Sequence, residues 1–305
     1  MGGVGRSKEL LDGLYAKGFK RPSKIQAAAL PIVLCKEKGM RNLIAQGQSG
    51  TGKTATYVLG MYSLVDPDVA VPQAICLEPT RELARQTFAV CKEIGKFTKV
   101  RAKLVIPGER CLSLSLSLSL SHPYLLCHKS HTYKQPHTHV YGTVPREGMF
   151  KEQVIVGTPG IVSEAVKRRC INPKMIVMLA VDEADHMLQE NLGEQTSFIR
   201  SQLRPEAKVM LFSATFPDSV KEFADKIAPA ARKITLKQSE VVLKRITQLT
   251  CRTDSEHSKF DIINAVFSSI SIGQTIIFVN VCTLPTFSAA TTTNSHKHVL
   301  FCGTH

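Results

Sequence analysis

The eight-residue segment Gly47-Gln-Ser-Gly-Thr-Gly-Lys-Thr54 constrains the fold of this chain more than any other feature. It fits the pattern GxxxxGK[ST], in which glycines let backbone N–H groups turn inward around phosphate oxygens. The short apolar segment Asn42–Gln46 precedes it, and Lys53–Leu64 follows with a helical pattern. Such a loop works where a strand ends and a helix begins, because the helix N-terminus favours an anion. We therefore expect an α/β fold whose loop binds a phosphate.

Short apolar segments alternate with amphipathic segments along most of the chain. We expect strands at Asn42–Gln46, Gln73–Glu78, Gln153–Gly157, Ile176–Val181, Lys208–Phe212 and Thr275–Asn280. We expect helices at Lys53–Leu64, Arg81–Phe97, from Ile161 onward, and at Ser219–Ile227 and Lys259–Ser269. The apolar segments lack a period of two, which is typical of strands buried on both faces. The pattern predicts a parallel sheet with helices on both faces.

The composition is that of a globular protein with a basic charge. Of the 305 residues, 43% are hydrophobic and 21% are charged, which excludes a disordered, collagen-like or coiled-coil chain. Lys and Arg number 39 against 25 Asp and Glu, a net charge of +14, which favours a polyanionic partner. The nine cysteines form no CxxC pair, as is typical of reduced, intracellular thiols. No apolar run reaches the roughly 18 residues of a membrane span.

Two acidic residues follow the apolar segment Val177–Val181. A carboxylate after such a strand lies at the edge of the sheet where ligands bind in open α/β folds. We expect Asp182 and Thr54 to hold Mg²⁺, partly through water, and Lys53 to contact the β- and γ-phosphates. Glu183 is positioned to polarise the attacking water. Lys53, Asp182 and Glu183 are therefore the predicted catalytic residues.

Asp182-Glu-Ala-Asp185 resembles the motif that names the DEAD-box RNA helicases, and other motifs appear in the order of that family. They resemble its glutamine motif, motif Ia, motif Ib and motif III, at Gly18–Gln26, Pro79–Ala84, Thr158–Gly160 and Ser213–Thr215. The resemblance covers most of residues 7–280, except about 111–149. Short phrases, among them Pro22–Ala27 and Gly273–Val279, are most similar to the mRNA-export branch, particularly its plant members.

The resemblance implies a RecA-like sheet of the P-loop NTPase type, with ATP and Mg²⁺ as cofactors. It implies that ATP is bound by Phe19, Gln26, Gln48, Ser49, Gly50, Thr51, Gly52, Lys53 and Thr54. The Gln26 amide carries a donor and an acceptor, the pattern that pairs with adenine N6 and N7. That chemistry favours ATP over GTP.

The family also implies an RNA partner and a cellular process. Contacts to the backbone of single-stranded RNA are implied for Pro79, Thr80, Arg81, Thr158 and Gly160, and such contacts are independent of sequence. Ser213 and Thr215 would couple the nucleotide state to RNA engagement. The branch implies RNA unwinding or RNP remodelling in mRNA export, by a monomer with nuclear-pore export factors as partners. The expected location is the cytoplasm and nucleus, including the nuclear-envelope side of the pore, without membrane insertion.

The pattern divides the chain into three parts. We expect a RecA-like ATP-binding domain at 1–237, the start of an incomplete second RecA-like domain at 238–280, and an irregular tail at 281–305. The first part is interrupted at about 111–149 by five consecutive Leu-Ser pairs and a segment with five of the ten histidines. A metal site is one interpretation of those histidines. A low-complexity insertion is favoured, because no ligand pairs have finger-like spacing on both sides.

Three features depart from the family pattern. Met1 stands where many relatives carry an upstream aromatic residue, and the insertion leaves only Gly108-Glu-Arg110 of a glycine-doublet region. The chain has no HRxGRxGR-like segment, whose arginines contribute roughly 10³–10⁵ in rate in related NTPases. One alternative is therefore a catalytically impaired ATP- and RNA-binding fragment, or an artefact of gene modelling. Another is an unrelated P-loop ATPase, against which the glutamine, Asp182–Asp185 and Ser213–Thr215 motifs argue.

Overall fold

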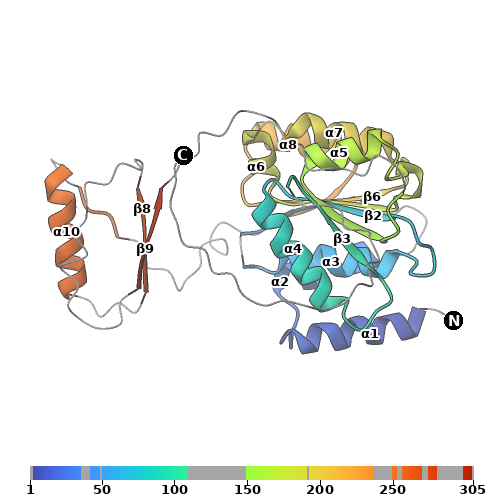
Figure 1. The fold of residues 1–305 in the computed structure, drawn as a ribbon, viewed down its shortest axis with the longest axis horizontal. Helices are drawn as coiled ribbons and strands as arrows, with labels where there is room; N and C mark the ends of the chain where they lie inside the picture. Colours follow the sequence, from blue (N-terminus) through green and yellow to red (C-terminus); the bar gives the residue numbers. More distant parts are fainter. Residues whose placement is uncertain are drawn as a thin grey trace, which may run out of the picture. The chain divides into compact units, whose positions relative to one another are not determined.

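A seven-stranded parallel sheet forms the centre of the first unit of the chain, Met1–Val242, in the computed structural model (Figure 1). Its strand order is β3–β4–β2–β5–β6–β1–β7, and each neighbouring pair is parallel. The strands are β1 Leu43–Gln46, β2 Ala74–Leu77, β3 Ala102–Val105, β4 Val154–Gly157, β5 Met178–Val181, β6 Lys208–Ser213 and β7 Arg232–Ile234. The carboxyl ends of parallel strands meet at one edge, so five predicted motifs, which follow β1, β2, β4, β5 and β6, share that edge.

The structure describes residues 3–35, 42–48, 50–108, 149–190, 192–235, 249–252, 256–269, 274–279 and 298–303. The predicted insertion at 111–149 lies outside the described residues except for Met149. Ser49 and the predicted domain boundary after residue 237 also lie outside them.

Helices cover both faces of the sheet, as the sequence pattern predicted (Figure 1). One face carries α1 Gly3–Ala16, α2 Lys24–Leu34, α3 Lys53–Leu64 and α4 Arg81–Ile94. The other carries α5 Pro159–Lys167, α6 Ala184–Gln189, α7 Gly193–Gln202 and α8 Asp218–Ile227, and the short 3₁₀ helix η1 spans Pro173–Met175. Within β5, Met178 and Ala180 pack under α1–α4, whereas Leu179 and Val181 pack under α5–α8. Burial on both sides explains why the strand segments show no polar alternation.

Several elements of the first unit were not predicted from the sequence: α1, α2, α6, α7, η1, β3 and β7. β3 and β7 are the two edge strands of the sheet, and their partial exposure weakens the apolar signal. Helix α2 contains Pro31, which usually argues against a helix interior. A capping box of Ser23 and Gln26 nevertheless starts this helix, and that signal precedes the apolar positions in the sequence.

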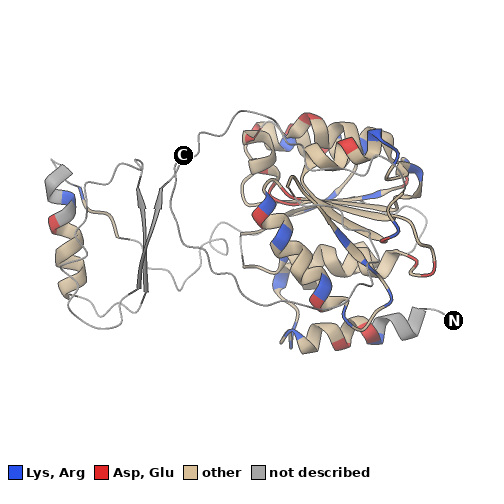
Figure 2. Cartoon of the chain, in the orientation of Figure 1, with Lys and Arg blue, Asp and Glu red and all other residues tan. Residues whose placement is uncertain are grey.

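Lys, Arg, Asp and Glu residues lie mainly in the helices and loops of the first unit (Figure 2). Lys208 instead lies in the central strand β6, and its side chain is fully buried. Its Nζ donates hydrogen bonds to the carbonyl oxygens of Ile32 and Val33, at 3.2 and 2.5 Å. These carbonyls belong to the last turn of α2, where backbone acceptors have no partner within the helix and a cation is favourable. Lys208 therefore fastens the C-terminal end of α2 to the sheet.

The second unit, Leu243–His305, contains the helix α10 Glu256–Ser269 and the strands β8 Gln274–Val279 and β9 His298–Gly303. The predicted helix at Lys259–Ser269 and strand at Thr275–Asn280 correspond to α10 and β8. The predicted irregular tail at 281–305 needs correction, because 298–303 form β9, which pairs in parallel with β8. A strand takes shape against its partner, so the short apolar run Val299–Phe301 was not recognised by itself. In the part of the chain that the structure describes, no helix has the length and apolarity to cross a bilayer.

Candidate functional site

The loop after β1, apart from the undescribed Ser49, is tied to the sheet and contains two glycines in a left-handed conformation. Its first residue, Gly47, donates a backbone hydrogen bond to the carbonyl oxygen of Ser213 at 3.1 Å, which ties the loop to β6. Gly50 and Gly52 have φ values of +82° and +94°, a region that favours glycine. A Cβ atom at Gly52 would also lie 2.5 Å from Nε2 of Gln26. A side chain at Gly52 would therefore obstruct the start of α3, whereas at Gly50 only the backbone conformation favours glycine.

The other predicted ATP-binding residues of the loop lie around the first turn of α3. Thr51 holds a tight turn, because its backbone N–H and its hydroxyl both donate to the carbonyl oxygen of Gln48, at 3.3 and 2.7 Å. Thr54 is half-buried, one residue after the buried Lys53. These placements leave the N-terminal end of a helix facing the carboxyl edge of the sheet, where an anion is favourable.

The three predicted catalytic side chains form one cluster. Lys53 is 4% exposed, and its Nζ lies 2.8 Å from Oε1 of Glu183 and 3.5 Å from Oδ1 of Asp182. Burial alone would lower the pKa of Lys53, but Asp182 and Glu183 together raise the pKa above its ordinary value. The lysine therefore remains a cation that can be offered to a phosphate.

Asp182 presents its two carboxylate oxygens to different partners. Oδ1 faces Lys53 and accepts the backbone N–H of Glu183 at 2.9 Å, whereas Oδ2 accepts the hydroxyl of Tyr57 at 3.1 Å. Burial raises the pKa of Asp182, and the charge of Lys53 opposes that shift. Mg²⁺ prefers oxygen ligands and usually binds one or two carboxylates besides waters and phosphates. The Asp182 carboxylate and the Thr54 hydroxyl fit that ligand set.

The predicted adenine-contacting glutamine is held beside the phosphate loop. Oε1 of Gln26 accepts the backbone N–H of Ser23 at 2.9 Å, and Nε2 donates to the carbonyl oxygen of Gly52 at 3.2 Å. The side chain thus joins the start of α2 to the start of α3. Phe19, the predicted stacking residue, is partly buried against the core under α1–α4.

Ser213 and Thr215, the predicted coupling residues, meet Asp185. The backbone N–H and the hydroxyl of Thr215 donate to Oδ2 of Asp185, at 3.1 and 2.7 Å. The backbone N–H of Asp185 donates to Oγ of Ser213 at 3.2 Å. Burial would raise the pKa of Asp185, but the hydrogen bonds from Thr215 and Ser213 hold it below its ordinary value. The loop after β6 is therefore fastened to Asp185, the second residue of α6.

The predicted RNA-contacting segments follow two neighbouring strands, β2 and β4. Thr80 caps α4 by accepting the backbone N–H of Leu83 at 3.3 Å, and Arg81 after it is exposed. Pro79 and Thr158 are buried, whereas Gly160 is exposed with open space above its Cα. The structure thus brings both segments to the edge that carries Lys53, and it leaves the Arg81 side chain accessible.

A group of buried polar side chains behind Asp182 was missed by sequence reasoning. Tyr57, Glu78 and Thr87 lie within hydrogen-bond distance of one another, and Tyr57 also reaches Asp182. Two signals were present in the sequence. Tyr57 lies four residues after Lys53 on the same helix, and Glu78 ends an otherwise apolar strand segment.

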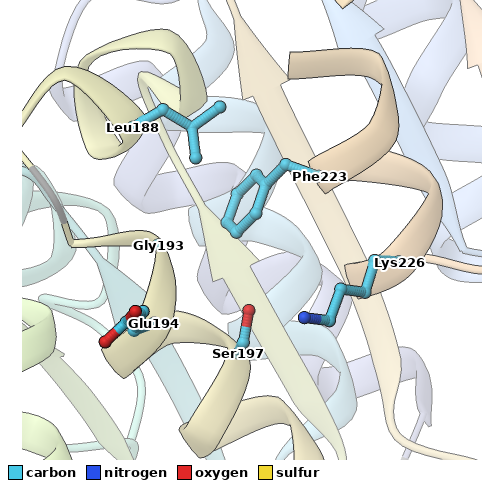
Figure 3. Close-up of a pocket in the computed structure, with 6 residues that line it drawn as sticks. All are labelled: Leu188, Gly193, Glu194, Ser197, Phe223 and Lys226. Carbon is cyan, nitrogen blue, oxygen red and sulfur yellow. The ribbon is translucent and has the colours of Figure 1, made fainter. Parts of the chain in front are cut away.

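A pocket of about 750 Å³ lies elsewhere in the first unit, between α6, α7 and α8 (Figure 3). It is lined by Leu188, Gly193, Glu194, Ser197, Phe223 and Lys226. Figure 3 shows the Leu188 and Phe223 side chains pointing toward each other. None of the residues predicted for ATP or RNA lines this pocket.

Comparison with known proteins agrees with the motifs. The family model "DEAD/DEAH box helicase" matches residues 23–223. The chain is 40% identical over 277 residues to the ATP-dependent RNA helicase DBP5 of Candida albicans, covering 90% of this chain and 45% of that protein. It is 39% identical over 277 residues to DBP5 of Saccharomyces cerevisiae, covering 90% of this chain and 50% of that one. The chain therefore spans about half the length of these curated relatives.

Among solved structures, S. cerevisiae Dbp5 bound to RNA and ADP BeF3 is similar with a TM-score of 0.72 and 39% identity, over 90% of this chain and 61% of that chain. A Dbp5 variant bound to Nup159, Gle1, IP6 and ADP is similar with a TM-score of 0.63 and 38% identity, over 90% and 63% of the two chains. The matched family region contains β1 to β6 and the whole cluster around Lys53. The chain belongs to the DEAD/DEAH box helicase family.

Proposed function

We propose that this chain binds ATP with Mg²⁺ and the backbone of single-stranded RNA. We propose that it acts as an ATP-dependent RNA helicase in RNA unwinding or RNP remodelling. The observation that carries the proposal is the cluster in which Lys53 bridges Asp182 and Glu183 at the edge shared with Arg81 and Gly160. A phosphate binder and an RNA-facing edge within one rigid sheet are what an ATP-driven RNA remodeller requires.

Each residue has a role that follows from its position. Lys53 exchanges its carboxylate partners for the β- and γ-phosphates of ATP, because phosphates carry more negative charge. Asp182 and Thr54 would hold Mg²⁺, which neutralises charge on the phosphates when it is bound. Glu183, freed from Lys53, accepts a proton from the attacking water. Gln26 is hydrogen-bonded to the loop through the carbonyl oxygen of Gly52, and it selects adenine.

The relatives support a proposal for the partners and the location of this chain. S. cerevisiae Dbp5 has been seen with RNA and ADP BeF3, and a variant of it with Nup159 and Gle1. Together with the resemblance to the mRNA-export branch, this supports nuclear-pore export factors as partners of this chain. We further propose that the chain acts in the nucleus and cytoplasm, at the pore, as a monomer.

Titration with a fluorescent ATP analogue tests nucleotide binding. We expect Lys53→Ala to weaken the affinity at least about tenfold, because it removes the phosphate-facing cation. Gln26→Ala should mainly reduce the preference for ATP over GTP. Lys221→Ala is the matched control, since Lys221 is an exposed lysine paired with Asp218 on α8. Equal affinities for the wild type and Lys53→Ala, or equal affinities for ATP and GTP, would refute the proposal.

Titration with a fluorescent single-stranded RNA tests the second half of the proposal. Arg81→Ala should weaken RNA binding by a similar factor for different sequences and reduce its salt dependence, because a phosphate contact carries no sequence information. Arg168→Ala, which alters an exposed arginine on the other face of the sheet, should change neither quantity. An unchanged RNA affinity in Arg81→Ala contradicts the assignment of this edge.

A further inference from the structure

Helix α3 contacts Asp182 with two side chains that lie one turn apart. Lys53 and Tyr57 are separated by four residues, so they occupy the same face of the helix. Nζ of Lys53 lies 3.5 Å from Oδ1 of Asp182, and the hydroxyl of Tyr57 lies 3.1 Å from Oδ2. The lysine therefore approaches the carboxylate on the side of the phosphate loop, and the tyrosine holds its other oxygen from the interior.

The Tyr57 hydroxyl is itself fixed in position. The side chain is fully buried, and its ring packs against Phe212 at a centroid distance of 5.6 Å. The hydroxyl lies 3.0 Å from Oε1 of Glu78 and 3.1 Å from Oγ1 of Thr87. Both neighbours are buried as well. The position of the phenol oxygen is thus set by β2, α4 and the core together.

Counting hydrogens shows which carboxyl group receives the Tyr57 hydrogen. A phenol has one hydrogen, so Tyr57 can donate to Asp182 or to Glu78 but not fully to both. Oε1 of Glu78 is already occupied by the Thr87 hydroxyl at 2.7 Å. Oδ2 of Asp182 is bonded to no other group than Tyr57 in the contacts described above, so it is the acceptor that depends on the Tyr57 hydrogen.

We propose that Tyr57 is a positioning residue for Asp182: its hydroxyl holds Oδ2 and keeps Oδ1 on the side of Lys53, so that the carboxylate is oriented to hold Mg²⁺ when ATP is bound, while Glu78 and Thr87 hold the hydroxyl. This inference rests on the proposed ATP-binding function. Removing a group that orients a metal ligand commonly weakens metal affinity about 10- to 100-fold. The substitution Tyr57→Phe tests the hydroxyl alone, because the ring stays in its place against Phe212.

The experiment measures binding of a fluorescent ATP analogue to the whole chain while Mg²⁺ is varied. For Tyr57→Phe we expect the Mg²⁺ concentration at half-maximal binding to rise about tenfold. Affinity for the nucleotide without Mg²⁺, in EDTA, should match that of the wild type. A loss of α3 structure would instead lower the nucleotide affinity both with and without Mg²⁺. Thr87→Val, which frees Glu78 to compete for the Tyr57 hydrogen, should raise the Mg²⁺ midpoint by a smaller factor.

Tyr62→Phe is the matched control. Tyr62 lies on the same helix and is 1% exposed, and its hydroxyl donates to the carbonyl oxygen of Cys91 at 2.9 Å, away from Asp182. Its Mg²⁺ midpoint should equal that of the wild type. Equal midpoints for wild type and Tyr57→Phe overturn the proposal, as does an equal rise in both tyrosine variants. If Tyr57→Phe does not fold, an unchanged midpoint in Thr87→Val overturns it. Absence of ATP binding by the wild type would instead defeat the proposed function, and the positioning role with it.

Discussion

Asp182 and Asp185 lie three residues apart in one acidic motif, yet their surroundings shift their pKa values in opposite directions. Burial and the neighbouring Glu183 raise the pKa of Asp182 despite the opposing charge of Lys53. Asp185 accepts two hydrogen bonds from Thr215, and together with Ser213 these hold its pKa below the ordinary value. The pKa values of the two aspartates thus differ because burial dominates at Asp182, whereas hydrogen bonds outweigh burial at Asp185.

The difference separates two tasks. Asp182 and Glu183 share the single ammonium group of Lys53. Negative charge on the two carboxylates therefore remains available for a further cation. The oxygens of Asp185 serve internal donors, so this residue fastens the loop after β6 to α6. We therefore expect substitutions at Asp185 to affect stability and substitutions around Asp182 to affect responses to ions and pH.

The largest effect is expected for Asp185→Ala. It removes a buried charged acceptor and the two hydrogen bonds that this acceptor receives from the exposed Thr215. Hydrogen bonds to a charged group contribute about 1.5–3 kcal/mol, so the free energy of unfolding should fall by about 2–3 kcal/mol. Urea denaturation measures this loss. Asp218→Ala is the control, because Asp218 is an exposed carboxylate on α8. A loss within about 0.5 kcal/mol of that control would show that the Thr215 contacts contribute little to stability.

An effect that is smaller per pH unit, with a specific pH dependence, is expected for Glu78→Gln. The pKa of Glu78 is about 8 in the fold against an ordinary 4.5, so between these pH values the folded chain binds a proton that the unfolded chain releases. The contribution of this group to stability is therefore complete below about pH 4.5 and is lost as the pH rises toward 8. Glutamine does not titrate. The variant should lose a slope of at most about 1.4 kcal/mol per pH unit.

Denaturation at several pH values between 5 and 8 measures this slope. Glu82→Gln on α4 is the matched control, because the Glu82 side chain is 72% exposed and pairs only loosely with Arg85, at 3.9 Å. If Glu78→Gln and the wild type keep the same slope, Glu78 is ionised throughout this range.

Much of the fold was predictable because its signals are local. The parallel sheet and the helices on both faces followed from apolar segments that alternate with amphipathic ones. The edge strands β3 and β7 were missed, because half-exposed strands carry a weak apolar signal. β9 was missed for another reason, since a strand forms against a partner and β8 lies 24 residues before it in register, at Gln274 opposite His298.

The candidate site divides in the same way. Lys53, Asp182, Glu183 and Thr215 were identified from motifs, because each motif is contiguous in the sequence. Asp185 belongs to one of these motifs, but its role became visible only beside Ser213 and Thr215. Tyr57 and Glu78 belong to no motif that was recognised, and each is an ordinary residue for a helix or a strand end.

The residue order alone established which groups follow each strand and therefore which chemistry reaches the carboxyl edge of the sheet. A glycine-rich loop with a lysine, and a strand that ends in two acids, have that consequence in any parallel sheet. The folded arrangement established how those groups are charged and held. Glu78, Thr87 and Asp182 lie on three separate segments, and their hydrogen bonds with Tyr57 and the shift in the pKa of Glu78 arise only when packing brings them together and removes water.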